Sequence, residues 1–416
     1  MRGARGGLLH ALAVASALAT ALADVAPLGQ FALEQVLHDS RQIFGEDDDV
    51  YHPSPPSWSS ASSSGGGGAA SMANWMARQP DAIPLAHMNI PGTHDAATWN
   101  YTARTQEALR PATRCGGGGA GKEVEVGDAR AYRCQRLSIA ASLARGIRFF
   151  DLRFAADPTA SGALVFWHAA ALLSARARVA DVLFGFYAWL EAHPSEAVVL
   201  SLQYETGMAA NATFDAGLQR ALLAALTSDA ARAFVHQGRG RLGTLGEYRG
   251  KILLVKRFAL ADLPEAQAAA LPGLSVPPAV WADNDPGFEI VYNESTNATA
   301  FIEDYYYPAS AATVADNVAA KLNATAMHLR RAASGNFDGL WITFSSGTHV
   351  DAVPPVTPET MALGTRGEAS DTGEGVEGVN HGLASVLREL KGLRLGIVVM
   401  DFFEEPPDLV DLVLRY

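Results

Sequence analysis

Cysteine is scarce in this sequence, which also lacks a long apolar run and an excess of basic residues. Two cysteines among 416 residues exclude a small scaffold held together by several disulfides. The apolar run at residues 8–19 is too short to cross a bilayer. The 44 acidic residues outnumber the 32 basic ones, and this balance argues against a nucleic-acid backbone as a partner.

The first 23 residues have the pattern of a secretory signal peptide. Arg2 and Arg5 precede the apolar run, and residues 21–23 (ALA) fit an A-x-A cleavage site. We therefore expect a secreted, extracellular protein in which Cys115 and Cys134 pair in a disulfide. Five N-x-S/T sequons fit a glycosylated product. They begin at Asn100, Asn211, Asn293, Asn297 and Asn323.

Composition divides the rest of the chain into an extension and one large domain. Residues 24–70 contain a weakly helical pattern at 25–44 and a flexible Ser/Gly-rich linker at 54–68. The domain is expected to occupy residues 71–416. A hydrophobic content of 49% is enough for a sizeable core.

Within this domain, eight short apolar segments alternate with helical patterns. This alternation predicts an α/β fold with a parallel sheet, and eight units favour a (β/α)8 barrel of the TIM type over a doubly wound open sheet. The predicted strands are residues 82–89, 147–154, 163–167, 197–202, 251–256, 288–292, 339–344 and 395–400.

Polar residues follow most of these strands, where barrel enzymes place their chemistry. They are His94 and Asp95, Asp151 and Arg153, His168, Gln203 and Glu205, Arg257, and Asp401. Cleavage of a phosphate diester needs a base, an acid and positive charge on the phosphoryl oxygens. Two histidines and an arginine meet these needs, so the sequence predicts a metal-independent site without a cofactor. Asp151 is expected to support an arginine.

Six motifs together resemble the bacterial-type phosphatidylinositol-specific phospholipase C family, whose members are barrels related to the phospholipase C X domain. They are IPGTHD at 90–95, GIRFFDLRF at 146–154, His168 after a short strand, PSEAVVLSLQYE at 194–205, RGKILLVKRF at 249–258 and GIVVMDFF at 396–403. The resemblance covers about residues 82–416.

The resemblance implies a role for each matching position. His94 corresponds to the base that deprotonates the inositol 2-hydroxyl, supported by Asp401, and His168 to the acid, supported by Asp95. Arg153 matches the guanidinium of the metal-free enzymes, where calcium-dependent relatives use a metal. The expected products are a cyclic inositol phosphate and diacylglycerol. Inositol contacts are implied for Gln203, Glu205, Arg257, Asp283 and Asp304, with Tyr306 as the ring under the sugar.

The sequence departs from the family at several positions. Gln203 replaces a common lysine, Trp167-His168-Ala169 replaces His-His-Gly, and residues 103–133 lack the interface-inserting tryptophan of bacterial enzymes. We therefore expect the substrate to be a phosphatidylinositol, a GPI glycan or a soluble inositol diester. The protein is expected to be a monomer that contacts the membrane transiently. Two alternatives stay open: an inactive barrel that binds inositol phosphate headgroups, and a metal-dependent barrel phosphodiesterase.

Overall fold

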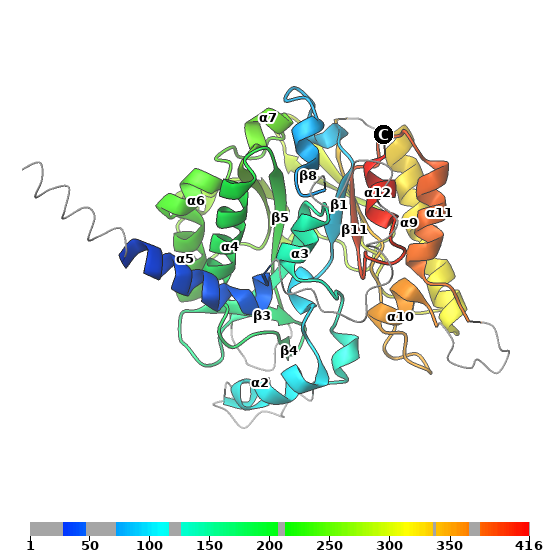
Figure 1. The fold of residues 1–416 in the computed structure, drawn as a ribbon, viewed down its shortest axis with the longest axis horizontal. Helices are drawn as coiled ribbons and strands as arrows, with labels where there is room; N and C mark the ends of the chain where they lie inside the picture. Colours follow the sequence, from blue (N-terminus) through cyan, green and yellow to red (C-terminus); the bar gives the residue numbers. More distant parts are fainter. Residues whose placement is uncertain are drawn as a thin grey trace, which may run out of the picture.

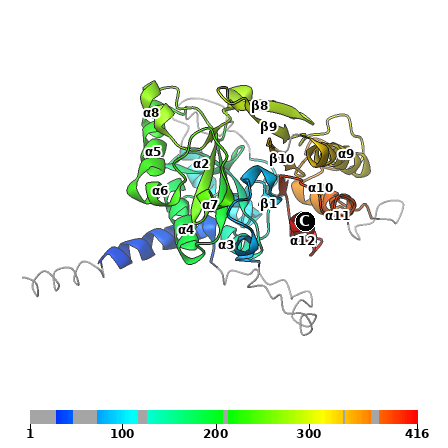
Figure 2. The ribbon, with the colours of Figure 1, turned by 90° about the horizontal axis from the view of Figure 1, so that it is seen from above.

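The computed structural model describes residues 28–46, 72–115, 126–206, 213–335, 338–365 and 375–415. A sheet of mostly parallel strands lies at the centre, with helices around it (Figure 1). Viewed from above, α5, α6 and α8 lie on one side of the strands and α9 and α11 on the other (Figure 2). The predicted signal peptide at residues 1–23 and the linker at 54–68 lie outside the described residues.

Nine strands form the main path of the sheet, in the order β7-β6-β5-β2-β1-β11-β10-β9-β8. The first eight in this order run parallel to one another. Their bounds are β7 Leu274–Ser275, β6 Lys251–Arg257, β5 Ala197–Tyr204, β2 Phe149–Ala156, β1 Ile90–Thr93, β11 Ile397–Met400, β10 Leu340–Phe344 and β9 Ala298–Glu303. This nearly closed barrel confirms the predicted α/β barrel class and excludes the doubly wound sheet.

The first predicted strand is wrong in position. Residues 85–87 form a short 3-10 helix, and the strand is β1 at Ile90–Thr93. Pro91 lies inside β1, but β1 pairs with β2 only from Gly92 onward, so no β2 residue needs an N–H from the proline. A Cβ on Gly92 would lie 2.8 Å from Phe149 side-chain atoms. Glycine therefore permits the close approach of β1 and β2.

Two predicted strands exist but do not belong to the parallel barrel, and two barrel strands were missed. β3 (Leu164–His168) pairs antiparallel with β2 and then with the short β4 (Ala171–Leu172). β8 (Phe288–Asn293) is antiparallel to β9 at the edge of the sheet. The missed strands β7 and β9 complete the eight parallel strands.

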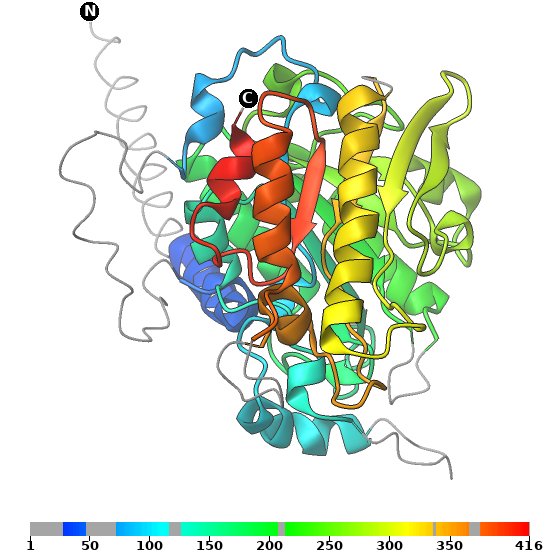
Figure 3. The same cartoon turned by 90° about the vertical axis from the view of Figure 1, so that its right-hand side faces the viewer.

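Helices connect the strands and cover the outside of the barrel. α4 (Val179–Ala192) begins where the Asp181 carboxylate accepts a hydrogen bond from the Arg178 backbone N–H at 3.0 Å. Figure 3 shows α9 and α11 side by side next to β11. The other helices are α2 Ala103–Cys115, α3 Ile139–Ala144, α5 Ala216–Thr227, α6 Asp229–Phe234, α7 Leu245–Tyr248, α8 Glu265–Ala270, α9 Val314–Ser334, α10 Pro358–Leu363, α11 Val379–Glu389 and α12 Leu409–Leu414.

The sheet separates two layers of buried apolar side chains. Alternate residues such as Phe149, Val199 and Ile342 form the interior cluster, while Phe150, Leu200 and Val398 face the helices. The helix at residues 28–44 extends the outer layer, because Phe44 packs edge to face on Phe186 of α4 at 5.2 Å. No helix among the described residues is long and apolar enough to span a membrane.

Candidate active site

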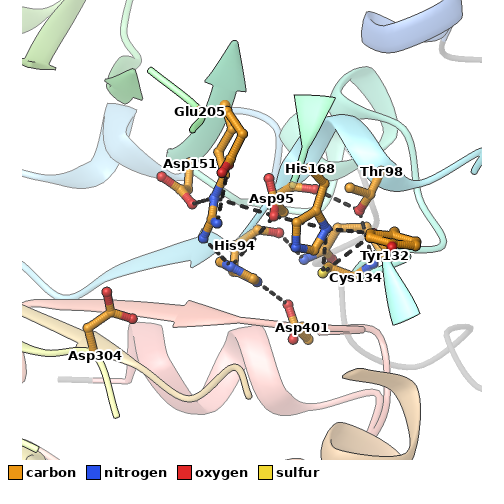
Figure 4. A network of polar contacts seen from close by, with 12 residues as sticks. His94, Asp95, Thr98, Tyr132, Cys134, Asp151, His168, Glu205, Asp304 and Asp401 are labelled. Atoms are coloured by element: carbon orange, nitrogen blue, oxygen red, sulfur yellow. Dashed lines mark hydrogen bonds and ion pairs between the residues drawn. The ribbon is translucent and has the colours of Figure 1, made fainter. Parts of the chain in front are cut away.

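The predicted polar residues meet at the carboxyl ends of the barrel strands. His94 directly follows β1, Asp401 directly follows β11, and Arg153 lies within β2. Asp151 and Arg153 are strand residues of β2 on one face, two positions apart. His168 reaches the same mouth by a different route, since β3 folds back antiparallel on β2. Figure 4 shows the two histidines converging between Asp95 and Asp401.

Three tight turns carry these side chains. Asp95, Ala169 and Phe402 have φ values of 42°, 46° and 45°, and they directly follow His94, His168 and Asp401. This left-handed conformation costs an L-residue roughly 1–2 kcal/mol. Backbone strain of this kind clusters at functional sites, and here it turns the chain sharply after each of the three residues that face the mouth.

His94 is held in one tautomer by two neighbours. Its Nδ1 lies 2.9 Å from Asp401 Oδ1, and its Nε2 lies 2.8 Å from Arg153 Nη2. A guanidinium can only donate, so Nε2 accepts and Nδ1–H donates to the carboxylate. Burial, with help from Arg153, lowers the pKa of His94 well below 6.5. The ring is therefore neutral, with its lone pair facing the mouth, as a general base requires.

His168 is oriented by the backbone and by a buried carboxylate. Its Nδ1 donates to the Tyr132 carbonyl at 2.8 Å and lies 3.2 Å from Asp95 Oδ2. Burial and the charge of Arg153 lower the pKa of His168 to about 4. Burial also raises the pKa of Asp95 to about 7. The Asp95–His168 pair thus holds a carboxyl group that titrates near neutrality.

Arg153 lies among three carboxylates. Its Nε is 3.4 Å from Asp95 Oδ2 and 3.5 Å from Asp151 Oδ2, and its Nη1 is 3.5 Å from Glu205 Oε2. Burial alone would lower the pKa of Arg153, but Asp95 and Asp151 hold it well above its ordinary value. The guanidinium therefore keeps its charge in a buried site and faces His94. The predicted convergence of two imidazoles and one guanidinium is present in the structure.

A second group of residues surrounds Arg257 at the end of β6. Arg257 Nη1 lies 3.2 Å from Asp151 Oδ1, and its guanidinium carbon lies 3.6 Å from the centroid of the Trp281 ring. Trp281 Nε1 donates to Asp304 Oδ2 at 2.8 Å. Asp151 thus joins the two arginines, which is the supporting role predicted for it. Trp281 contacts both Arg257 and Asp304 and holds them in place.

Asp283 and Tyr306 form a separate pair at the rim. Tyr306 Oη donates to Asp283 Oδ1 at 2.9 Å in an exposed position. Asp304 connects this pair to the centre of the site. It lies two residues before Tyr306 in the chain, and its backbone carbonyl accepts a hydrogen bond from the Tyr306 N–H at 3.1 Å. The structure therefore places Asp283 and Tyr306 at one side of the mouth and the two histidines at its centre.

Gln203 and Glu205 come from β5, on the strand between those of the two arginines. Gln203 is in register with Arg153 on β2 and with Arg257 on β6. Its Oε1 is buried and has no hydrogen-bond partner. Glu205 contacts Arg153 and burial raises its pKa. An unpartnered amide between two arginines is a polar group that a ligand could satisfy.

The predicted disulfide is not formed, and this is a correction. Cys134 is a free cysteine with a buried side chain, and the Cys115 side chain lies outside the described residues. Residues 132–135 instead build the floor of the site. Gln135 Nε2 donates to the carbonyls of His94 and Met400 at 2.7 and 2.9 Å, tying β1 to β11. No sequence motif marked this segment, because its contacts are to backbone carbonyls.

Comparisons with known proteins agree with this arrangement. No protein-family profile matches the chain. Over 146 residues it is 31% identical to PI-PLC X domain-containing protein 1 of Mus musculus, a match that covers 33% of this chain and 40% of the mouse protein. The chain thus spans less than half the length of this relative.

Two bacterial enzymes share the fold along nearly their whole length. A variant of the phosphatidylinositol-specific phospholipase C of Staphylococcus aureus superposes with a TM-score of 0.60 at 19% identity, covering 83% of this chain and 97% of that one. The Listeria monocytogenes enzyme superposes with a TM-score of 0.53 at 20% identity, covering 82% and 97%. Another S. aureus structure, concerned with modulation of that enzyme's membrane binding, gives 0.59 at 20% identity.

The chain shares its barrel fold with these bacterial enzymes, and two histidines are paired at the mouth of the barrel. Over part of its length, the sequence is also similar to a PI-PLC X domain-containing protein.

Proposed function

We propose that this protein is a metal-independent phosphodiesterase that cleaves inositol phospholipids by attack of the inositol 2-hydroxyl on phosphorus. The carrying observation is that a neutral His94 and the Asp95–His168 pair face each other across a mouth that also contains Arg153. This arrangement supplies a base, an acid and a fixed positive charge at one place.

In the first step His94 acts as the general base. The substrate hydroxyl replaces Arg153 at Nε2 and gives its proton to that nitrogen as its oxygen forms a bond to phosphorus. Asp401 accepts the hydrogen bond from Nδ1–H at 2.9 Å and stabilises the imidazolium that forms. The released guanidinium of Arg153 binds the phosphoryl oxygens, for which its planar fork is suited.

His168 acts as the general acid for the leaving alkoxide. In the free protein its ring is neutral, because burial and Arg153 lower its pKa. A bound phosphodiester brings negative charge next to Arg153 and offsets that effect, which favours protonation of His168. The bond from phosphorus to the glycerol oxygen breaks, the oxygen takes the His168 proton, and the products are a cyclic inositol 1,2-phosphate and diacylglycerol.

We propose metal independence because Arg153 neutralises the carboxylates around it. Its guanidinium contacts Asp95, Asp151 and Glu205, so the carboxylates that could hold a hard cation are already neutralised by the chain's own residue. We therefore expect activity that needs no added divalent cation. This expectation separates the proposed function from a metal-dependent barrel phosphodiesterase.

The loop after β10 supports membrane contact beside the site. Val353 is 91% exposed and Val350 is 37% exposed. The Thr348 N–H in the same loop donates to the Tyr306 carbonyl at 2.8 Å, which places the loop at the rim. Exposed apolar side chains next to a mouth suit a lipid surface. We also propose that the protein is secreted and acts as a monomer. N-terminal sequencing of the exported protein tests the cleavage after residue 23.

Phosphorus NMR of the products tests the proposal. The full chain is incubated with phosphatidylinositol in mixed micelles and excess EDTA, and a cyclic inositol phosphate signal is expected. His168→Ala abolishes the signal, whereas His87→Ala, in the 3-10 helix before β1, retains it. Headgroup binding without any product would favour the inactive binding barrel. Turnover that EDTA stops would favour the metal-dependent enzyme, and either outcome overturns the proposal.

A further inference from the structure

A buried thiol lies between the two histidine–carboxylate pairs of the mouth. Cys134 Sγ is 4.0 Å from His168 Nδ1 and 3.9 Å from the Tyr132 carbonyl oxygen. Figure 4 shows the sulfur below the His168 ring, on the same side of the site as Tyr132. The steps of the proposed reaction do not use this thiol, which raises the question of what else it can bind.

The atoms around Cys134 form a compact set of ligands for a metal ion. One ring nitrogen of His94, the sulfur of Cys134 and one carboxylate oxygen of Asp401 all lie within 4.8 Å of one another. His94 Nδ1 and Asp401 Oδ1 are already 2.9 Å apart. In tetrahedral zinc sites the bonds to sulfur, nitrogen and oxygen are about 2.3, 2.0 and 2.1 Å long. Small side-chain shifts would bring these three atoms to such distances.

A second observation also points to a cation. Asp401 is 1% exposed, and its Oδ2 has no hydrogen-bond partner in the structure. A buried carboxylate oxygen without a donor costs free energy, and a metal ion would satisfy it. His94 is 14% exposed, so an ion can approach from the mouth.

We propose that Cys134, His94 and Asp401 form an inhibitory binding site for a thiophilic divalent cation such as Zn²⁺. On binding, the metal forms bonds to Sγ, Nδ1 and a carboxylate oxygen. The thiol proton is released to solvent, the ring proton of His94 moves from Nδ1 to Nε2 as Arg153 withdraws from that nitrogen, and water from the mouth completes the tetrahedron. No electron transfer is involved.

Inhibition follows from the position of the metal in the acid–base machinery. The metal takes the place of the proton that joins His94 to Asp401, so His94 loses the hydrogen bond that supports it as a base. With its ring proton on Nε2, His94 has no free lone pair facing the mouth and cannot accept the proton of the substrate hydroxyl. This consequence rests on the proposed function, whereas binding of the metal does not.

The ligand set selects the kind of cation. Thiolate and imidazole suit Zn²⁺, Co²⁺ and related ions, whereas Ca²⁺ and Mg²⁺ require oxygen ligands in larger number. The positive charges of Arg153 and Arg257 also repel any cation, and only an ion that bonds strongly to sulfur can overcome this repulsion. Millimolar Ca²⁺ is therefore expected to leave the site unoccupied.

Cobalt binding to the full chain tests the site without reference to activity. Addition of Co²⁺ should produce a near-ultraviolet thiolate-to-metal charge-transfer band together with the visible bands of a tetrahedral site. Cys134→Ser should lose the charge-transfer band, while Cys115→Ser, which alters the other cysteine, keeps it. Circular dichroism checks that both variants are folded. Absence of the band, or its persistence in Cys134→Ser, would overturn the site.

Zinc inhibition tests the consequence. Micromolar Zn²⁺ should suppress phosphodiesterase turnover, EDTA should restore it, and Cys134→Ser should raise the half-inhibitory Zn²⁺ concentration at least tenfold above that of Cys115→Ser. Equal sensitivity of the two variants would refute inhibition through Cys134. A cobalt band in a protein without phosphodiesterase activity would uphold the metal site and reject the proposed function, so the two failures are distinguishable.

Discussion

The imidazole rings of His94 and His168 face each other nearly at right angles, with centroids 6.2 Å apart and an angle of 88° between their planes. Each ring has its own carboxylate, Asp401 for His94 and Asp95 for His168. Two imidazoles with separate supports can hold different protonation states at one time, as paired acid and base catalysis requires. The two histidines are far apart in the chain, so it is the folding of the barrel that brings their rings together.

Asp401→Asn tests how His94 is held. An amide nitrogen facing Nδ1 would donate to it, which moves the ring proton to Nε2 and removes the lone pair from the mouth. We expect kcat to fall by roughly 10²–10⁴-fold with little change in KM. Nitrogen NMR of the His94 ring should report the change of tautomer. Asp411→Asn, an exposed position in α12, is the control, and a wild-type kcat in Asp401→Asn would contradict the assignment.

Ala169→Gly tests the strained turn after His168. Ala169 has a φ of 46°, where an L-residue is disfavoured by roughly 1–2 kcal/mol, whereas glycine adds about 0.4–1 kcal/mol of unfolded-state entropy. We expect the variant to be at least as stable as the wild type, by up to about 1 kcal/mol in urea unfolding. Ala224→Gly in the middle of α5, where φ is helical, should lose about 1 kcal/mol. Equal losses in the two variants would show that the turn stores no strain.

The sequence predicted the barrel class and the central residues of the site because both depend on patterns local in the chain. β6 (Lys251–Arg257) follows its apolar run and ends one residue beyond the predicted strand at 251–256. His94, His168 and Asp401 stand at or next to strand ends and Arg153 lies within β2, and the structure brings their side chains together at one mouth.

The errors come from interactions between distant segments. β7 has only two residues, and β9 alternates weakly, so their pairing partners decide that they are strands. β3 has an apolar pattern like that of a barrel strand, and only its antiparallel register with β2 excludes it from the barrel. The pairing of Cys134 with Cys115 was inferred from their number and expected compartment. The structure instead buries the Cys134 thiol beside His168.

Val353→Asp tests the lipid contact of the rim. Val353 is 91% exposed in the loop after β10, and full burial of a valine in an apolar phase is worth about 1.5–3 kcal/mol. A carboxylate there should reduce turnover of vesicle-bound phosphatidylinositol by about tenfold or more and leave turnover of a soluble inositol phosphodiester unchanged. Val291→Asp on the edge strand β8, also exposed, is the matched control. An equal effect on the soluble substrate would reject a role in membrane contact.

His328→Gln tests how buried histidines set the pH dependence of stability. His328 in α9 is 1% exposed, its Nδ1 lies 2.8 Å from Thr343 Oγ1, and burial lowers its pKa from 6.5 to about 3. Below pH 6.5 the unfolded chain therefore binds a proton at this position that the folded chain does not bind. The free energy of unfolding must then fall on acidification, by up to about 1.4 kcal/mol for each pH unit between 6.5 and the folded pKa.

Other groups titrate in the same range, so the comparison of variants carries the test. Glu303 acts in the opposite direction, because burial raises its pKa to about 7 and the folded chain keeps a proton that the unfolded chain loses. Glu303 is present in both wild type and His328→Gln, so its contribution cancels when urea unfolding of the two proteins is compared at pH 7 and pH 5. The wild type should lose roughly 2 kcal/mol more than the variant over this interval, while His38→Gln, at an exposed position, should follow the wild type. Parallel losses in wild type and His328→Gln would mean that the folded chain binds a proton at His328, and that burial does not keep this ring neutral.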